Sequence, residues 1–369
     1  MIFKNDDEAV LPDKGKKKLL VVYNKVWPYR VCIFNILSEK FDLTVAVNDR
    51  TSLSQSYNFK VVYLETKKVG PFQWHRNNLR KIMNSFDCVV GLYDIRWLRF
   101  MLASLFSKSP VIFWGIGVTA SYENKFDSKS TWDRVRLFFA KRSRGVLLYS
   151  DYPVERHIRL GMPKDRIWVA HNTTNVSLDS YDEKCERCSI LFVGSLYKEK
   201  NVMGLLGDYR KAVNVSGSIP KLEVIGSGED FEMAKKFVID NELSDKVVMH
   251  GAIYNPQDLV SIFNRGIVCI SPSQAGLSVL TSMGMGVPFA TNSDAITGGE
   301  IFNIRHLETG VFIDKLAEDT TSFFLWVEKN HEDLLYMGIK ARDFYLSYRR
   351  PEITSDIISQ AVESAIKCS

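Results

Sequence analysis

Short apolar runs alternate along most of the chain with segments whose apolar residues recur at helical spacing. The first series begins at Leu19–Tyr23 and ends at Arg166–Ala170, and the same alternation restarts at Ser189–Val193. Buried runs between amphipathic helices are typical of repeated strand–helix units and of parallel sheets. The pattern therefore predicts an α/β protein with two Rossmann-like, doubly wound domains. Within the first series, the apolar spacing over residues 73–86 predicts a helix.

Breaks in this pattern predict the domain boundaries. Residues 176–188 are polar and lack periodicity, so they are interpreted as a linker between an N-terminal domain at 1–175 and a C-terminal domain at 189–347. The final helical stretch is interrupted at Arg349-Arg-Pro351, because proline does not continue a helix without a kink. We expect residues 348–369 to form a helix that returns to the first domain. Two such domains would face a central cleft lined by the loops that follow the strands.

The stretch from Gly266 to Thr291 is the strongest local candidate for ligand binding. It reads as strand, glycine-containing loop, helix and strand, with the helix starting at Leu277–Ser278. The start of a helix presents free N–H groups and the positive end of its dipole, which suit a phosphate. Gly276 removes a side chain where a phosphate would approach, and Ser278 can cap the helix or donate a hydroxyl. The alternative is an ordinary crossover with a capped helix.

Other loops of the second half contain residues suited to a diphosphate, a base or a sugar. Lys200 follows the glycine that ends a strand at Gly194, and a lysine is a compact charge for phosphate. Glycines 226 and 228 allow a flat base to approach, His250 ends the next strand, and Glu300 could bind sugar hydroxyls or support a positive transition state. Each also fits an ordinary structural role: a solvated helix start, a plain turn, a hydrogen-bonded histidine or an acid at a helix start.

Candidate acceptor residues lie in the first half. Trp114, Gly115 and Gly117 end a strand and suit a sugar ring stacked on an aromatic side chain, although a core tryptophan with turn glycines fits equally well. Arg30 lies near the first strand–helix junction, where an anion could bind, and Asn172 is expected at the domain boundary.

One helix of the first half carries both bases and aromatic residues. Over Trp132–Arg144 this mixture suits an interfacial position on an anionic membrane. An ordinary surface helix that packs on its own sheet is slightly favoured, because the segment lies inside the strand–helix series.

Composition narrows the classes of function. The chain has 369 residues, 46% hydrophobic, with a net charge of +5 and no long basic run, so nucleic acid is not expected as a partner. No apolar run reaches the roughly 20 residues that span a bilayer, and residues 1–18 lack the apolar core of a secretory signal, so a cytoplasmic location is expected. Cys185 and Cys188 lack a second pair for a metal site, so no metal and no cofactor is predicted.

The order of these motifs resembles the nucleotide-sugar glycosyltransferases of the two-Rossmann (GT-B) fold, most closely the large retaining family 4. The matching pieces of the second half are Phe192-Val-Gly-Ser-Leu-Tyr-Lys-Glu-Lys200, Val224-Ile-Gly-Ser-Gly228, Met249-His-Gly251, Ser271 to Pro288 and Glu308-Thr-Gly310. The first half is similar in Tyr29-Arg-Val-Cys-Ile-Phe-Asn35, Phe113-Trp-Gly-Ile-Gly117 and His171-Asn-Thr173. The chain departs from the family at Ser195, where many members have arginine, and at Ser273 and Thr281, where they have paired glutamates. The resemblance implies that Glu300 replaces these acids.

The resemblance implies a sugar nucleotide in the second domain, an acceptor in the first and no need for a metal. Lys200 and Glu300 are then the catalytic candidates. The implied donor-binding residues are Gly194, Ser195, Gly226, Ser227, Gly228, His250, Gly251, Gly276, Leu277, Ser278 and Thr281. The implied acceptor-binding residues are Arg30, Trp114, Gly115, Gly117 and Asn172.

The sequence thus predicts a glycosyltransferase that uses a nucleoside-diphosphate sugar and a glycan or lipid-linked acceptor, with retention, in the synthesis of a surface polysaccharide at the inner face of the membrane. Two alternatives stay open: a GT-B-fold sugar-nucleotide epimerase, and a non-catalytic, glycosyltransferase-like binding subunit.

Overall fold

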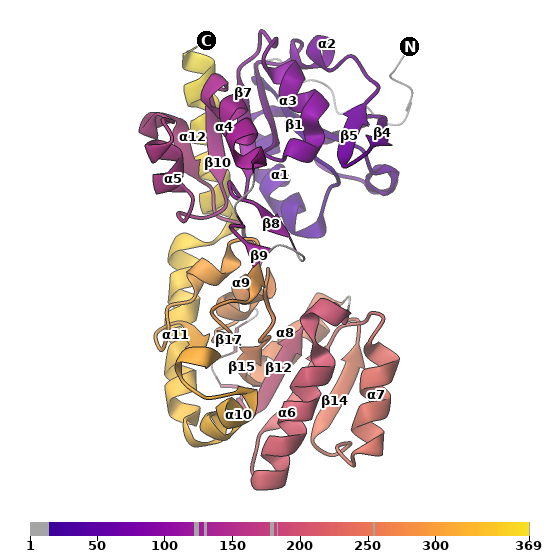
Figure 1. Cartoon of the computed structure of the whole chain (residues 1–369), viewed down its shortest axis with the longest axis vertical. Coiled ribbons are helices and arrows are strands. Elements are labelled where there is room, and N and C mark those ends of the chain that lie inside the picture. The colour runs from indigo at the N-terminus through magenta and orange to yellow at the C-terminus, as the bar shows by residue number, and fades with distance from the viewer. Residues whose placement is uncertain are drawn as a thin grey trace. The chain divides into compact units, whose positions relative to one another are not determined.

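Two units, each built on a parallel sheet, make up the described chain (Figure 1). The structure is a computed structural model that describes residues 15–121, 125–128, 131–177, 181–182, 184–253 and 255–368. The first unit comprises the residues up to Thr119, Ser128–His171 and those from Pro351 onward. The second comprises Ala120–Asp127 and Asn172–Arg350. The predicted fold class, α/β with two doubly wound parallel sheets, is confirmed.

The sheet of the first unit has seven parallel strands whose order reverses at β1. In spatial order they are β11 (Ile167–Val169), β10 (Gly145–Leu148), β7 (Val111–Gly115), β6 (Cys88–Leu92), β1 (Lys18–Val22), β2 (Asp42–Val47) and β3 (Lys60–Tyr63). The chain moves outward from β1 to β3 and then crosses back to β6 on the other side of β1. Ligands of open α/β sheets bind outside the carboxyl ends of the strands at such a reversal.

Alternate residues of β1 face opposite layers of helices, as the two-residue period of a strand requires. Leu19 and Val21 belong to the apolar cluster that α1 (Pro28–Lys40) and α12 (Pro351–Lys367) cover. Leu20 and Val22 belong to the cluster on the other face. The helices of that second face are α2 (Leu79–Met83), α3 (Leu98–Ser104) and α4 (Trp132–Arg142), while α5 (Val154–Arg159) follows β10.

The helix predicted over residues 73–86 is wrong over its first part. Residues 66–75 instead form an antiparallel hairpin of β4 (Thr66–Val69) and β5 (Phe72–His75), and only α2 is helical. The turn at Gly70–Pro71 joins the two strands, and Gly70 adopts a left-handed φ of 57° that favours glycine. Pairing with β4 therefore outweighs the helical spacing of the apolar residues.

The sheet of the second unit repeats the same order with six parallel strands. In spatial order they are β14 (Val247–Gly251), β13 (Lys221–Ile225), β12 (Ser189–Val193), β15 (Gly266–Ile270), β17 (Phe289–Thr291) and β19 (Gly310–Phe312). Its reversal lies between β12 and β15, so the loops after these two strands are neighbours.

Helices cover both faces of this second sheet (Figure 1). One face holds α6 (Val202–Val215), α7 (Phe231–Asp240) and α10 (Thr320–Lys329), and the other holds α8 (Pro256–Arg265), α9 (Ser278–Gly284) and most of α11 (His331–Tyr348). Short two-stranded pairs, β16 (Gln274–Ala275) with β18 (Ile296–Thr297) and β8 (Ala120–Ser121) with β9 (Lys125–Phe126), complete the described strands.

The last helix belongs to the first unit although it follows the second unit in the chain. α11 ends before Pro351, and α12 then packs along α1, where Lys40 Nζ pairs with Asp356 Oδ1 at 2.7 Å. Ile358, Ala361 and Val362 are buried in the core beside the sheet. The structure also places the boundary between the units after His171, a few residues before the boundary expected from the sequence.

We predict that Ile358→Ala destabilises the first unit by about 2–5 kcal/mol, because truncating a fully buried isoleucine leaves a cavity. Chemical denaturation followed by tryptophan fluorescence measures this change. Gln360→Ala, at an exposed position of the same helix, is the matched control and should change the free energy of unfolding by less than about 0.5 kcal/mol. Identical unfolding curves for the two variants would contradict the role of α12 in the core.

Candidate functional site

Backbone hydrogen bonds join three of the predicted glycine loops at the carboxyl ends of the second sheet. The loop after β12 donates from Leu196 N to Ser227 O at 2.9 Å, and the loop after β13 donates from Gly226 N to Gly251 O at 2.8 Å. The structure thus brings together the loops that contain Gly194, Gly226 and Gly251 as one connected surface.

Close approach of two backbones requires glycine at position 226. A Cβ added there would lie 1.8 Å from the carbonyl oxygen of Gly194, and the backbone adopts φ +145°. Gly228 is constrained in the same way, since its Cβ would lie 2.1 Å from Leu196 O. The loops therefore offer bare backbone beside the exposed side chains of Ser195 and Ser227.

A tight turn holds Lys200 against this surface. Residues Lys198–Lys200 form a 3₁₀ turn, after which Asn201 adopts a left-handed φ of 52° and its side chain caps α6 through Gly204 N at 3.2 Å. A Cβ added to Gly194 would lie 3.0 Å from Lys200 Nζ, so the ammonium group contacts the glycine backbone. Only 6% of Lys200 is exposed.

Burial lowers the pKa of Lys200 from its ordinary value, and the neighbouring Cys269 and Glu300 oppose that shift. Because Cys269 lies on β15 and Glu300 follows β18, the ammonium group lies near the reversal of the second sheet. No carboxylate of the described residues lies within ion-pairing distance of Lys200. This buried cation has the character of a phosphate ligand.

Glu300 is buried and held by three donors. Its Oε1 accepts from Asn172 Nδ2 at 2.7 Å, and its Oε2 accepts from Gly298 N at 2.9 Å and from Thr297 Oγ1 at 3.4 Å. Asn172 lies at the boundary between the units, as expected from the sequence, and its amide holds Glu300. Its role in acceptor binding stays a prediction. Its Oδ1 is buried and lacks a partner among the described residues.

The loop before α9 lies on the other side of the reversal from Gly194. Leu277 occupies the cap position without a side-chain hydrogen bond, so Ser278 does not cap the helix as the sequence allowed. The hydroxyls of Ser278 and Ser271 are buried and without a partner in the described part of the chain. A Cβ at Gly276 would meet no atom within 4 Å, so space is open beside this backbone.

Two predicted donor-binding side chains already have partners. His250 Nε2 lies 2.8 Å from Glu223 Oε2, and Arg265 pairs with the same carboxylate at 2.9 Å. Burial alone would raise the pKa of Glu223, but the hydrogen bonds from Arg265, Ser189 and His250 lower it overall. The Thr281 hydroxyl lies 3.2 Å from that of Thr174. These contacts give both side chains a structural role, so a ligand would meet the adjacent backbone first.

In the first unit, Trp114 does not present a free face for a sugar. It is 1% exposed, and the guanidinium of Arg30, itself fully buried, lies 4.2 Å from the centre of its ring. Gly115 and Gly117 fit closely around other side chains, with a Cβ at Gly117 lying 2.7 Å from Leu148 Cδ2. This packing fits the alternative of a core tryptophan with turn glycines, and the acceptor-binding role of the three residues stays a prediction.

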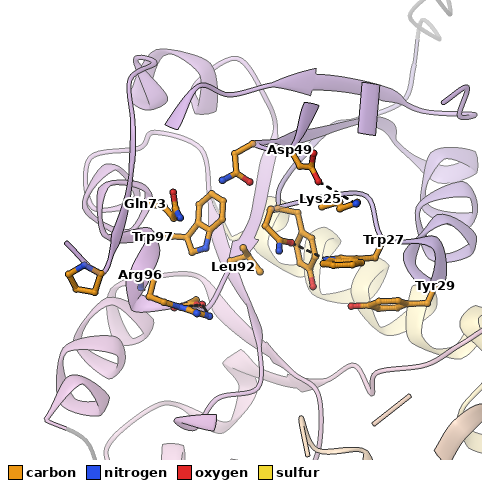
Figure 2. A pocket seen from close by; sticks show the side chains of 13 residues that line it. Lys25, Trp27, Tyr29, Asp49, Gln73, Leu92, Arg96 and Trp97 are labelled. Atoms are coloured by element: carbon orange, nitrogen blue, oxygen red, sulfur yellow. Dashed lines mark hydrogen bonds and ion pairs between the residues drawn. The ribbon is translucent and has the colours of Figure 1, made fainter. Parts of the chain in front are cut away.

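A pocket of about 610 Å³ lies instead at the reversal of the first sheet (Figure 2). Its lining comes from the loops after β1, β2 and β6, where Tyr23, Trp27, Asp49 and Asp94 lie. Two ion pairs border it, Lys25 with Asp49 at 3.4 Å and Arg96 with Asp94. The sequence analysis missed most of this pocket, because only the strand order shows which loops meet there.

Neither a metal nor a disulfide site accompanies these features in the described residues. No group of three or more His, Cys, Asp or Glu side chains is placed to hold a metal ion there. Cys185 and Cys188 are free thiols, as are the other four cysteines.

Comparison with solved structures assigns the chain to the GT-B fold. The structure of HepE (Alr3699) from Anabaena in complex with UDP matches with a TM-score of 0.70 at 13% identity, covering 94% of this chain and 100% of that one. A glycosyltransferase from Rickettsia africae matches with a TM-score of 0.71 at 12% identity, covering 96% and 100%. Sucrose-phosphate synthase from Thermosynechococcus elongatus matches with a TM-score of 0.68 at 14% identity, covering 96% and 100%.

A family model gives a more specific match to part of the chain. The model described as glycosyl transferases group 1 matches residues 187–323, which include β12 to β19 and the loops that hold Lys200, Gly276 and Glu300. No curated protein sequence matches the chain. Residues 187–323 are thus similar to group 1 glycosyltransferases, on a chain with the GT-B fold.

We predict that Gly226→Ala destabilises the second unit by more than about 2 kcal/mol, because its Cβ would overlap the carbonyl oxygen of Gly194. Thermal and chemical unfolding measure the loss. The control is Gly207→Ala inside α6, where a Cβ meets nothing within 4 Å and the better helix former should add up to about 1 kcal/mol. If both variants were equally stable, the tight backbone approach at Gly226 would be refuted.

Proposed function

We propose that the protein transfers a sugar from a nucleoside-diphosphate sugar to a hydroxyl group of a glycan or lipid-linked glycan. The observation that supports this function best is the buried Lys200 ammonium against the bare backbone of Gly194, at the reversal of a doubly wound sheet. A buried cation that forms no ion pair with the described residues matches a diphosphate in both charge and position.

In the proposed reaction the bond between the anomeric carbon and the diphosphate oxygen breaks, and the leaving diphosphate keeps the electron pair. The acceptor oxygen forms the new bond to the anomeric carbon and passes its proton to the leaving diphosphate. Lys200 and the amides around Gly276–Ser278 stabilise the charge that grows on the diphosphate. Glu300, fixed by Asn172 and Gly298, supports the positive charge that develops on the sugar. We also propose that the transfer retains the configuration at the anomeric carbon, that the enzyme is of the family 4 type, and that it needs no metal ion.

The comparisons suggest the first donor to try. HepE was solved in complex with UDP and with UDP-glucose, and it shares the fold of this chain. The match of residues 187–323 to group 1 glycosyltransferases supports a sugar nucleotide in the second unit. A uridine diphosphate sugar is therefore the leading donor class in this proposal.

A screen of sugar nucleotides separates transfer from the alternatives. UDP-, GDP- and CMP-linked sugars are tested for a rise in melting temperature, since a ligand that binds the folded state stabilises it by mass action. Stabilisation with slow hydrolysis of one donor supports a transferase, stabilisation without turnover supports a non-catalytic binding subunit, and interconversion of two sugar nucleotides supports an epimerase. The replacement of family acids by Ser273 and Thr281 keeps the second outcome open.

We predict that Lys200→Met lowers kcat for donor hydrolysis or transfer by roughly 10²–10³-fold, because it removes a charge that stabilises the leaving diphosphate. The variant keeps an apolar chain of similar length in the buried site, so the fold should persist. Lys198→Met is the control, since Lys198 lies in the same turn but is exposed, and its turnover should stay near that of the wild type. A folded Lys200→Met protein with normal turnover would overturn the assignment.

We further propose that the protein acts at the cytoplasmic face of the membrane in polysaccharide synthesis, with α4 touching anionic lipid. Phe139 and Ala140 of this helix are buried in the core, whereas Trp132 is 46% and Phe138 is 43% exposed. Arg142 lies 3.7 Å from the centre of the Phe138 ring, so a base and an aromatic share the exposed face. None of the described helices has the length and apolar character needed to span a bilayer.

We predict that the protein floats with vesicles containing phosphatidylglycerol at low salt and is released at high salt, as expected for an interface of bases and aromatic residues. Trp132→Ser and Phe138→Ser should weaken flotation severalfold. Met233→Ser, which replaces an exposed apolar residue of α7, is the control and should bind like the wild type. Absence of flotation by the wild type at low salt would exclude the membrane contact.

A further inference from the structure

Arg30, the third residue of α1, is a fully buried cation that has no counter-ion among the described residues. Its exposed fraction is 0%, and its Nε, Nη1 and Nη2 atoms are all buried without a hydrogen-bond partner among the described residues. Leaving a charged group unpaired in a protein interior costs several kcal/mol, so such a group is rare without a function.

Four aromatic rings surround the guanidinium. Its central carbon lies 4.2 Å from the ring centre of Trp114, 5.0 Å from that of Tyr149, 5.1 Å from that of Tyr29 and 5.9 Å from that of Tyr23. Contacts between a cation and aromatic faces recover only part of the lost hydration. The rings therefore lower the free-energy cost of burying the Arg30 charge, but they do not neutralise that charge.

Tyr149 supplies no negative charge to Arg30. The hydroxyls of Tyr23 and Tyr149 lie 2.9 Å apart and share a hydrogen bond. Burial holds the pKa of Tyr149 well above its ordinary value, so this phenol stays neutral. Burial alone would lower the pKa of Arg30, but the surrounding tyrosines raise it, so the guanidinium keeps its charge.

The same cluster contains a second buried donor without an acceptor. The indole Nε1 of Trp114 is buried and has no partner in the described part of the chain. Guanidinium and indole nitrogens can only donate hydrogen bonds. A ligand that satisfies them must be rich in acceptors, and an anion with several oxygens does so best.

Tyr23 and Tyr29 connect this cluster to the pocket at the reversal of the first sheet. Both rings contact Arg30 and both line the pocket of about 610 Å³, and Figure 2 shows Tyr29 beside Trp27 at its edge. The pocket's own cations, Lys25 and Arg96, are already paired with Asp49 and Asp94. Arg30, which Tyr23 and Tyr29 contact, differs from these two cations because it has no ion-pair partner among the described residues.

We propose that this pocket binds an acceptor sugar that carries an anionic group, a phosphate or a carboxylate, and that Arg30 holds that group once the Tyr29 ring turns aside. The exposed ring of Trp27, which stacks on Tyr29 with 6.4 Å between ring centres, provides an apolar surface for the sugar. Only the assignment of this ligand as the acceptor rests on the proposed transferase function.

The test uses the full chain and three sugars that differ in charge: glucose, glucuronate and glucose 1-phosphate. Calorimetric titrations are made in the Lys200→Met background, which removes the phosphate ligand proposed for the second unit. At least one anionic sugar should bind about tenfold or more tightly than glucose, since hydrogen bonds to charged groups are the strong ones. Preference for glucose 1-phosphate identifies a phosphate group, and preference for glucuronate identifies a carboxylate.

Two further substitutions distinguish a binding role from a structural one. Arg30→Met should abolish the preference for anionic sugars without lowering the melting temperature, because it removes an unpaired buried charge. Trp114→Phe keeps a ring in place but removes the indole donor, so it should weaken binding of the preferred anionic sugar severalfold. If Arg30→Met fails to fold, the proposal is tested by the Trp114→Phe variant instead. Equal binding of the three sugars, or anion binding that neither substitution changes, would overturn the proposal.

The outcome is distinguishable from failure of the transferase proposal. Stabilisation by UDP that Lys200→Met removes and Arg30→Met leaves unchanged reports on the second unit. If no sugar nucleotide stabilises the protein but the Arg30-dependent preference remains, the anionic-sugar site stands and the transferase fails. If a sugar nucleotide binds and the preference is absent, the transferase stands and the acceptor is not recognised by an anionic group at Arg30.

Discussion

The cost of burying a positive charge constrains both units of this molecule. Lys200 in the second unit and Arg30 in the first are almost or fully buried, and neither pairs with a carboxylate of the described residues. An interior cation of this kind lowers stability unless something compensates for its lost hydration. The fold tolerates each by different means, with bare glycine backbone around Lys200 and four aromatic rings around Arg30. Neither arrangement supplies an ion pair from the described residues to neutralise the charge.

Strand order explains why these features lie where they do. The strands of both sheets follow the same spatial order. Each sheet therefore has one point where the strand order reverses, between β1 and β6 in the first unit and between β12 and β15 in the second. Loops that leave a reversal diverge to opposite faces and open a crevice. In the first unit the pocket bordered by Tyr23 and Asp94 lies at this reversal. In the second unit the loops on the two sides of the reversal are those that contain Gly194 and Gly276.

Sequence reasoning recovered the sheets and the loops of the second unit, because these depend on local patterns. Strands such as β12 are short apolar runs, Gly194 and Gly226 follow strand ends directly, and Lys200 lies in the same loop as Gly194. The sequence was less informative where distant contacts decide. The strand β5 forms through pairing with β4, and the burial of Trp114, which the sequence left as one of two alternatives, depends on Arg30 and Tyr149. The pocket of the first unit was missed because no sequence motif records that the loops after β1 and β6 are neighbours.

The position of α12 has a consequence for how the molecule is made. The apolar face of the first sheet that contains Leu19 and Val21 is completed by Ile358, Ala361 and Val362. A ribosome delivers those residues only after the whole second unit has been synthesised, since protein chains emerge from their N-terminus. The first unit therefore waits with an uncovered hydrophobic surface, although its strands emerge first, while residues 172–350 can already fold. The first unit is thus translated first, but its hydrophobic core is completed last.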